Sequence, residues 1–244
     1  MSSPPVSPPD VGVVIVAAGA GVRAGPGEPK QFRSILGVPM LLRALRPFTS
    51  HPEVAHVVIA LPSAYVDRPP EWLGKLVGER LALVRGGELR PQSVRAGLRA
   101  LPPDARVVLV HDAARPFVSR STIDGVIARA RQGIGAVAAL PVTDTVKEVG
   151  EGSRVMRTVA RDRLWRAQTP QGFPRAMIDR TYADLPADDG AAGQDGGGGG
   201  ATDDAELCER AGFPVEVVPD APQNLKVTTA DDFRIAEALA RDVR

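Results

Sequence analysis

The sequence predicts an α/β fold with a mostly parallel sheet and helices on both faces of that sheet. In the first half of the chain, apolar runs of strand length alternate with segments of helix length. Runs without polar alternation are typical of strands that are buried on both faces, as in a parallel sheet. Glycine-rich or charged segments follow several of these runs. Because ligands bind beyond the carboxyl ends of parallel strands, these segments form the candidate site.

Each element has a local signal. Runs rich in valine, leucine and alanine predict strands at residues 11–17, 54–61, 81–84, 106–110, 136–142 and 215–218. Helical patterns predict helices at residues 39–49, 69–79, 91–101, 119–132, 202–211 and 229–241. Pro39 suits a first helical turn, whereas Ser119 or Ser121, and later Thr202, suit N-caps.

The pattern changes near residue 143. Residues 145–149 and 154–160 alternate polar and apolar side chains around a glycine-containing turn, which predicts a β-hairpin. We expect this arm, at about residues 143–161, to have little core of its own. Such an arm usually packs on something else, so we expect a homodimer formed through it.

Length, composition, net charge and cysteine count limit the class of protein to which the chain can belong. The chain has 244 residues, with 43% hydrophobic and 24% charged, which is typical of soluble globular proteins. A net charge of +1 gives no basic field for nucleic acid. No apolar run approaches about eighteen residues, so we expect no membrane partner and a cytoplasmic protein. The single cysteine, Cys208, excludes an intramolecular disulfide and a thiolate metal cluster.

One domain is expected over residues 11–244. Residues 1–10 are rich in proline and serine and read as a disordered tail. Residues of about 185–201 are of low complexity and end in five glycines. We therefore expect a flexible loop there rather than a boundary between two cores.

A glycine loop with two cations follows the first predicted strand. Gly19 and Gly21 let backbone N–H groups approach an anion. Arg23 and Lys30 would stabilise charge on a leaving pyrophosphate. The loop lacks the third glycine of a dinucleotide fingerprint and the Gly-Lys-Ser/Thr of a P-loop, so hydride transfer and ATP hydrolysis lose support. The structural alternative is a strand-to-helix turn with surface charges.

Two further segments lie at predicted strand ends. Asp112 follows a predicted strand, a position from which a carboxylate can bind a divalent cation that bridges phosphates. The alternative is a structural role in a turn or as a helix N-cap. Arg115 could bind an anionic substrate. His111 is expected to be a buried residue whose ring nitrogens are hydrogen-bonded within the protein. Gly87 would let a flat base lie against the backbone and Ser93 would hydrogen-bond it, the alternative being an ordinary loop. The candidate residues further along the chain are expected to be structural or exposed when each is taken alone. Trp165 is expected to lie in the core.

These segments together resemble a known family. The motifs that carry the resemblance are, in order, AAGAGVR with PKQ, GGELRPQSV, HDAARP, PVTDTVK, LWRAQTPQGF, TDDAELCERAG and NLKVTT. The chain resembles the 2-C-methyl-D-erythritol 4-phosphate cytidylyltransferases of the non-mevalonate isoprenoid pathway. The resemblance implies a Rossmann-like nucleotidyltransferase fold with a projecting β-hairpin arm that builds a homodimer. It also implies transfer of the cytidylyl group of CTP to methylerythritol phosphate, with Mg²⁺ as cofactor.

The resemblance assigns roles by position. The residues that correspond to the binding site of the CTP triphosphate are Ala17, Ala18, Gly19, Gly21, Arg23 and Lys30, of which Arg23 and Lys30 are catalytic. The cytosine-binding turn falls to Gly87, Arg90 and Ser93. The residues that correspond to the binding site of the acceptor are Asp112, Arg115, Thr145, Thr169 and Thr202. Asp112 is also the implied metal ligand. Arg161 and Lys226 are the catalytic residues that position the acceptor phosphate, and some acceptor contacts come from the partner's arm.

The chemistry agrees with that assignment. A phosphate monoester is already a nucleophile at neutral pH, so the protein must align it and screen charge rather than supply a base. Glu88 replaces a common Asp of the family and Asp204 replaces a common Glu, both with conserved charge. The alternatives are a sister enzyme for a pentitol phosphate such as ribitol 5-phosphate, and a nucleotide-binding regulatory domain without turnover. The presence of Arg23 and Lys30 disfavours the regulatory domain.

Overall fold

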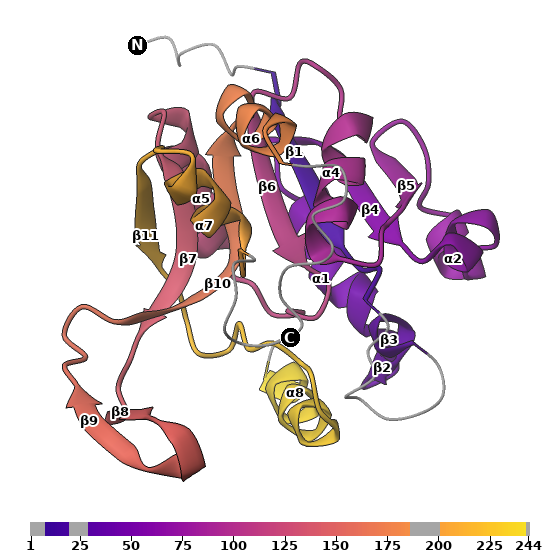
Figure 1. Ribbon diagram of the computed structural model, residues 1–244. Coiled ribbons are helices and arrows are strands. Elements are labelled where there is room, and N and C mark those ends of the chain that lie inside the picture. Colours follow the sequence, from indigo (N-terminus) through magenta and orange to yellow (C-terminus); the bar gives the residue numbers. More distant parts are fainter. Residues whose placement is uncertain (1–7, 20–28, 186–200, 243–244) are drawn as a thin grey trace, which may run out of the picture.

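A central sheet of seven strands organises the chain, in the order β11-β7-β10-β6-β1-β4-β5 (Figure 1). The computed structural model describes residues 8–19, 29–185 and 201–242. The strands of the sheet are β1 (Val11–Val16), β4 (Val54–Leu61), β5 (Leu81–Arg85), β6 (Val107–Asp112), β7 (Gly135–Pro141), β10 (Trp165–Pro174) and β11 (Val215–Pro219). β1 runs parallel to β4 and β6, β4 to β5, and β7 to β11. The predicted mostly parallel fold is confirmed.

β10 is the antiparallel exception and lies between β6 and β7. This strand is absent from the predicted elements because its centre is polar, yet Gln168, Thr169 and Gln171 are all buried. Their side chains bond to other parts of the chain, so hydrophobic patterning does not reveal the strand. The expectation of a buried Trp165 is wrong: its side chain is 41% exposed, at the end of β10 that leads from the arm.

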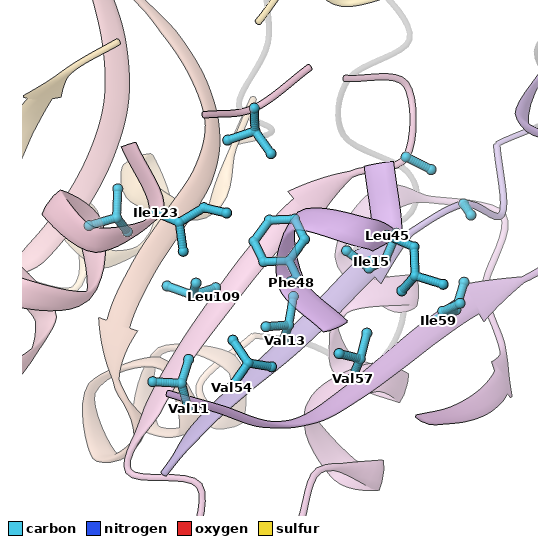
Figure 2. Packing of buried hydrophobic residues seen from close by; sticks show 14 of the residues in the cluster. Val11, Val13, Ile15, Leu45, Phe48, Val54, Val57, Ile59, Leu109 and Ile123 are labelled. Carbon is cyan, nitrogen blue, oxygen red and sulfur yellow. The ribbon is translucent and has the colours of Figure 1, made fainter. Parts of the chain in front are cut away.

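Helices cover both faces of the sheet. They are α1 (Met40–Thr49), α4 (Arg90–Ala100), α5 (Arg120–Arg131), α6 (Arg175–Ala183) and α7 (Asp204–Arg210). The last helix, α8 (Ala230–Asp242), packs instead in a third cluster that includes Ile35 and Phe117. α1 and α5 bury their apolar residues in one core cluster, and α4, α6 and α7 in a second. Alternate residues of β1 divide between them, with Val13 and Ile15 in the first and Val14 in the second. Figure 2 shows Phe48 of α1 among the side chains of the first cluster.

A glycine sets the approach of α4 to the sheet. A Cβ atom placed on Gly97 would lie only 2.3 Å from Cγ1 of Val14. Any larger residue would therefore push α4 away from β1. Since α4 begins at Arg90, this close packing also places the first turn of the helix near the ends of the strands.

Most predicted elements agree with the structure, and Ser119 is the N-cap of α5, accepting a hydrogen bond from the Thr122 amide at 3.1 Å. The helix predicted at residues 69–79 is present but much shorter than expected. Only α3 (Glu71–Gly74) forms within that range, because prolines precede it and glycines at positions 74 and 78 favour its early end. A further short helix, α2 (Ser63–Asp67), precedes it and was not predicted. α6 has no counterpart among the predicted helices.

The predicted cap of α7 is also wrong. Asp203, not Thr202, is the N-cap, and its carboxylate accepts from the Glu206 amide at 2.9 Å. Thr202 instead donates its hydroxyl to the Glu206 carboxylate at 2.9 Å. Asp is as good a cap as Thr or better, so the choice between neighbours was open in the sequence.

The arm is a separate two-stranded sheet made of β8 (Val146–Val149) and β9 (Val155–Val159). The turn is η3 (Glu151–Ser153), and Figure 1 shows the arm projecting away from the central sheet. The amide of Val142 donates to the carbonyl of Leu164 at 2.9 Å, which closes the base of the arm. The predicted hairpin is confirmed.

Small elements connect β1 to α1, namely η2 (Lys30–Phe32), β2 (Ser34–Ile35) and β3 (Val38–Pro39). Gly21 and Arg23 lie outside the described residues, as do most of the expected tail at residues 1–10 and of the expected loop at about 185–201. In the described part of the chain, none of the helices has the length and apolar character needed to cross a bilayer.

Candidate active site

A pocket of about 160 Å³ opens at the carboxyl ends of β1 and β6, beside the turn that follows β5. Distant parts of the chain meet there. The residues with predicted ligand roles that line it are Ala17, Gly19, Lys30, Gly87, Arg90, Ser93, Asp112 and Lys226. The parallel sheet thus brings these predicted positions together at one edge, where ligands of such sheets bind.

The glycine turn after β5 forms one wall of the pocket. The Gly87 amide donates to the Ser93 hydroxyl at 3.1 Å, and the Gly86 amide donates to the Leu61 carbonyl at 2.8 Å. A Cβ atom on Gly86 would lie 2.4 Å from Cβ of Ala18, so the turn packs directly on the segment after β1. The Ser93 side chain therefore holds the shape of the turn within the chain.

The segment before α1 forms the opposite wall. Gln31 is buried and donates its side-chain amide to the Ala17 carbonyl at 2.8 Å. Lys30 lines the pocket, and its ammonium donates to the Val227 carbonyl at 3.3 Å. These contacts place a cation between the end of β1 and the segment that carries Lys226.

Asp112 lies at the end of β6 and is the centre of the charges in the pocket. Its Oδ2 lies 2.8 Å from the Lys226 ammonium, and its Oδ1 lies 3.4 Å from Nε of Arg90. Burial opposes ionisation of this carboxyl, but Arg90, Lys226 and Arg115 outweigh burial and lower the pKa of Asp112 below its usual range. Asp112 is therefore a carboxylate at neutral pH.

Arg90 begins α4 and sits between two carboxylates. Besides Asp112, its guanidinium contacts Oδ2 of Asp204 at 2.7 Å. Burial would lower the pKa of Arg90, but Asp204 and Asp112 outweigh burial and raise the pKa above its usual value. The guanidinium is thus charged and held on both sides.

A layer of buried hydrogen bonds supports Asp112 from behind. The Thr169 hydroxyl accepts from the Asp112 amide at 3.0 Å and lies 3.0 Å from Nδ1 of His111. Nε2 of His111 lies 3.0 Å from the Arg115 carbonyl, which only accepts, so Nε2 carries the proton and Nδ1 accepts from Thr169. Burial lowers the pKa of His111 to about 4, so the ring is neutral at pH 7 and serves as a structural link.

Arg115 and Asn224 belong to the same buried layer. Arg115 donates to the Asn224 carbonyl at 2.8 Å, and the Asn224 amide donates to the Thr169 carbonyl at 2.8 Å and to Asp220 at 2.6 Å. Burial lowers the pKa of Arg115. Its Nε atom is buried without a hydrogen-bond partner among the described residues.

Five predicted acceptor residues do not line this pocket, namely Arg115, Thr145, Arg161, Thr169 and Thr202. Thr145 and Arg161 lie at the base of the arm and are exposed, with Arg161 donating to the Thr143 carbonyl. Thr202 is exposed beside Glu206. Thr169 lies behind Asp112 rather than on the pocket surface. Within one chain, the structure therefore collects most of the described residues that were predicted for the nucleotide side, and leaves Thr145 and Arg161 on the exposed arm.

Several residues at the site have no role among the sequence-based predictions. Gln31, Asn224 and Asp204 are polar, yet none is more than 2% exposed. Their signal in the sequence is their place within the motifs PKQ, NLKVTT and TDDAELCERAG. Residue type alone does not separate them from surface residues, because burial of a polar group depends on tertiary partners.

A magnesium ion fits the donors of the pocket in one specific mode. In the described part of the chain, no three His, Cys, Asp or Glu side chains are placed to hold a metal ion by themselves. Mg²⁺ commonly binds through one or two carboxylates together with substrate phosphates and water. The ionised, pocket-facing Asp112 suits that mode, in which the phosphates supply the remaining oxygens.

Comparison with known proteins gives a consistent family. The sequence model described as 2-C-methyl-D-erythritol 4-phosphate cytidylyltransferase matches residues 11–242. Proteins of that name from Streptomyces coelicolor and Salinibacter ruber are 42% and 41% identical to this chain. The alignments cover 96% and 93% of this chain, and 86% and 91% of the respective relatives.

Solved structures agree with these sequence matches. The 2-C-methyl-D-erythritol 4-phosphate cytidylyltransferase from Thermus thermophilus superposes with a TM-score of 0.75 at 34% identity, covering 95% of this chain and 99% of the other. The 4-diphosphocytidyl-2C-methyl-D-erythritol synthase from Anaerococcus prevotii gives a TM-score of 0.78 at 26% identity, covering 95% and 96%. These matches confirm the Rossmann-like nucleotidyltransferase fold. The chain therefore belongs to the 2-C-methyl-D-erythritol 4-phosphate cytidylyltransferase family.

Proposed function

We propose that this protein transfers the cytidylyl group of CTP to 2-C-methyl-D-erythritol 4-phosphate in non-mevalonate isoprenoid precursor biosynthesis. The products are 4-diphosphocytidyl-2-C-methyl-D-erythritol and pyrophosphate. The observation that carries this proposal is the pocket at the strand ends, where a glycine turn, Lys30, Lys226 and an ionised Asp112 converge. The match to the family over nearly the whole chain supports the same reaction.

The reaction needs charge screening and alignment. An oxygen of the acceptor phosphate attacks the α-phosphorus of CTP, and the bond from that phosphorus to the β-phosphate bridging oxygen breaks. The electron pair of that bond leaves with pyrophosphate. Lys30 lines the pocket and would stabilise the growing negative charge, with Arg23 proposed for the same task. The acceptor is already anionic, so no side chain needs to act as base.

The acceptor phosphate is assigned to Lys226 and Arg161. Lys226 lies at the pocket with its side chain 43% exposed, so its ammonium is accessible to a phosphate. Asp112, which now pairs with Lys226, would hold a magnesium ion together with substrate phosphates. Bound there, the ion would neutralise phosphate charge. Of the two cations paired with Asp112, Lys226 is the more exposed and would turn toward the acceptor phosphate.

The arm supports a homodimer. Val149, Val155 and Met156 on the arm are all more than half exposed. Exposed apolar side chains gathered on a projecting hairpin favour contact with another surface. A second copy would bring an arm, with Thr145 and Arg161 at its base, toward the pocket of its partner. The cytoplasmic location also stays a prediction, supported by the soluble composition and single cysteine of the sequence.

A substrate panel tests the proposal. Purified protein is given CTP, Mg²⁺ and either methylerythritol 4-phosphate or ribitol 5-phosphate, and pyrophosphate release is measured. We expect turnover with methylerythritol 4-phosphate. Turnover with ribitol 5-phosphate alone would assign the chain to the sister activity. Nucleotide binding without pyrophosphate release from either acceptor would identify a regulatory domain.

A further inference from the structure

A chain of contacts runs behind the pocket from α6 through α7 to α4. The Tyr182 hydroxyl lies 2.5 Å from Oδ1 of Asp204 and donates to it. The Arg90 guanidinium lies 2.7 Å from Oδ2 of the same carboxylate. Each oxygen of Asp204 therefore accepts from a different donor, and the carboxylate cannot rotate without losing both contacts.

This anchor is enclosed. Asp204 is 0% exposed, and Tyr182 is also buried. Burial and the neighbouring Asp204 raise the pKa of Tyr182 well above its usual value, so the hydroxyl keeps its proton and remains a donor. A buried carboxylate that loses a partner is strongly unfavourable, so Asp204 holds Arg90 firmly.

The far side of Arg90 faces the reacting centre. Its Nε lies 3.4 Å from Oδ1 of Asp112, whereas Lys226 takes the other oxygen of Asp112 at 2.8 Å. The two cations differ in their surroundings, because the Lys226 side chain is 43% exposed and the Arg90 side chain 25%. Lys226 is thus the cation that can turn to a substrate, and Arg90 is the cation held in place.

We propose that Asp204 and Tyr182 are positioning residues for cytidylyl transfer, which act through Arg90 to keep Asp112 in place when Lys226 turns to the acceptor phosphate. Neither residue lines the pocket. This role rests on the proposed function, because that function assigns Lys226 to the acceptor phosphate. When the ion pair between Asp112 and Lys226 is broken, the guanidinium of Arg90 remains as the counter-charge of Asp112.

The first test measures kcat and KM for both substrates in Asp204→Ala and Tyr182→Phe. We expect Asp204→Ala to lower kcat about 10²-fold, the loss that follows a small misplacement of catalytic groups, with KM for CTP within about threefold. Tyr182→Phe should lower kcat about tenfold, since it removes one hydrogen bond to a charged group. The matched control is Tyr65→Phe, the other tyrosine of the chain, which packs on Phe32 and should keep wild-type kcat.

The second test asks whether the two residues act in one chain of contacts. The double variant Tyr182→Phe with Asp204→Ala should be no slower than Asp204→Ala alone, because Tyr182 acts through Asp204. Asp204→Glu should recover most of kcat, since it keeps the charge and both acceptor oxygens. Effects that multiply in the double variant, or a failure of Asp204→Glu to exceed Asp204→Ala, would overturn the proposal.

Folding is followed alongside activity by thermal unfolding of every variant. If Asp204→Ala does not fold, the same comparison is made with Asp204→Asn, which keeps the shape of the side chain and removes its charge. Folded Asp204 variants with wild-type kcat would refute the positioning role. Absence of turnover in the wild-type protein would instead refute the proposed function, so the two failures are distinguishable.

Discussion

The pocket and the arm hold their charges in opposite surroundings. At the pocket and directly behind it, the carboxylates of Asp112 and Asp204 are at most 11% exposed and each has more than one polar partner. On the arm, Arg157 and Glu148 pair at 2.5 Å while 70% and 50% exposed. Breaking an enclosed pair leaves an uncompensated charge, whereas an exposed pair contributes about 0–1 kcal/mol. The contrast indicates that the charges at the pocket are fixed by enclosed partners within the chain, whereas those on the arm are open to solvent.

The largest expected effect lies in the pocket. Lys30→Ala should lower turnover about 10²–10³-fold, because it removes a preorganised cation from the site where charge develops. Pyrophosphate release with CTP and methylerythritol 4-phosphate measures it. The control is Lys75→Ala, an exposed lysine paired with Glu71 on α3, which should keep wild-type turnover. An unchanged turnover number in Lys30→Ala would remove that residue from the mechanism.

The buried layer behind the pocket should make stability depend on pH. His111 has a pKa of about 4 in the folded protein against about 6.5 when unfolded. Between these values the unfolded chain binds more protons, so stability falls as pH falls from about 6.5 toward about 4. We expect His111 to cost about 2 kcal/mol of unfolding free energy between pH 7 and pH 5.

Urea unfolding at both pH values measures this loss. His111→Gln should be less stable than the wild type at pH 7 and should lose less stability on acidification. An equal loss in both proteins would show that another group, rather than this imidazole, controls the pH dependence of the fold.

Association should depend on the arm. Met156 is 65% exposed, and Met156→Asp should weaken a homodimer about 30-fold, equivalent to about 2 kcal/mol at a well-packed interface position. Sedimentation over a concentration series measures the association constant. Leu76→Asp changes an apolar residue that is 43% exposed away from the arm and should leave association unchanged. A wild-type protein that is monomeric at micromolar concentration and fully active would remove the dimer from the proposal.

The smallest effect tests the contrast between arm and pocket directly. A double-mutant cycle of Arg157→Ala and Glu148→Ala should give a coupling energy of about 0–1 kcal/mol in urea unfolding, as expected for an exposed pair. A coupling well above that range would mean that another surface encloses the pair. The arm and the pocket would then hold their charges in the same way.

The sequence predicted the parallel half of the fold because local patterns and tertiary roles coincide there. The apolar run of β1 is buried on both faces, and Ser119 caps the helix that its position suggests. β10 was missed because Thr169 and Gln171 are polar by type and buried by context. Only the pairing of their side chains with His111 and Asp203 explains that burial.

The candidate site was predictable in location but not in its internal pairing. Asp112 and Lys226 are 114 residues apart in sequence (226 − 112), and no local rule places a 2.8 Å contact between them. Asp204 looked like one of several acidic residues at the start of a helix. Its enclosure between Tyr182 and Arg90 depends on how three helices meet, which patterning does not encode.

The closure between Val142 and Leu164 has a topological consequence. β7 and β10 are adjacent antiparallel strands, with Trp165 opposite Pro141, so the whole arm is an insert in the connection of one long hairpin. Insertions or deletions in such a connection leave the register of the flanking strands unchanged. Evolution or an engineer can therefore vary the length of the arm, or replace it with a short turn, while Thr169 keeps its place behind Asp112. The register of the strand pair behind Asp112 is therefore set independently of the length of the arm.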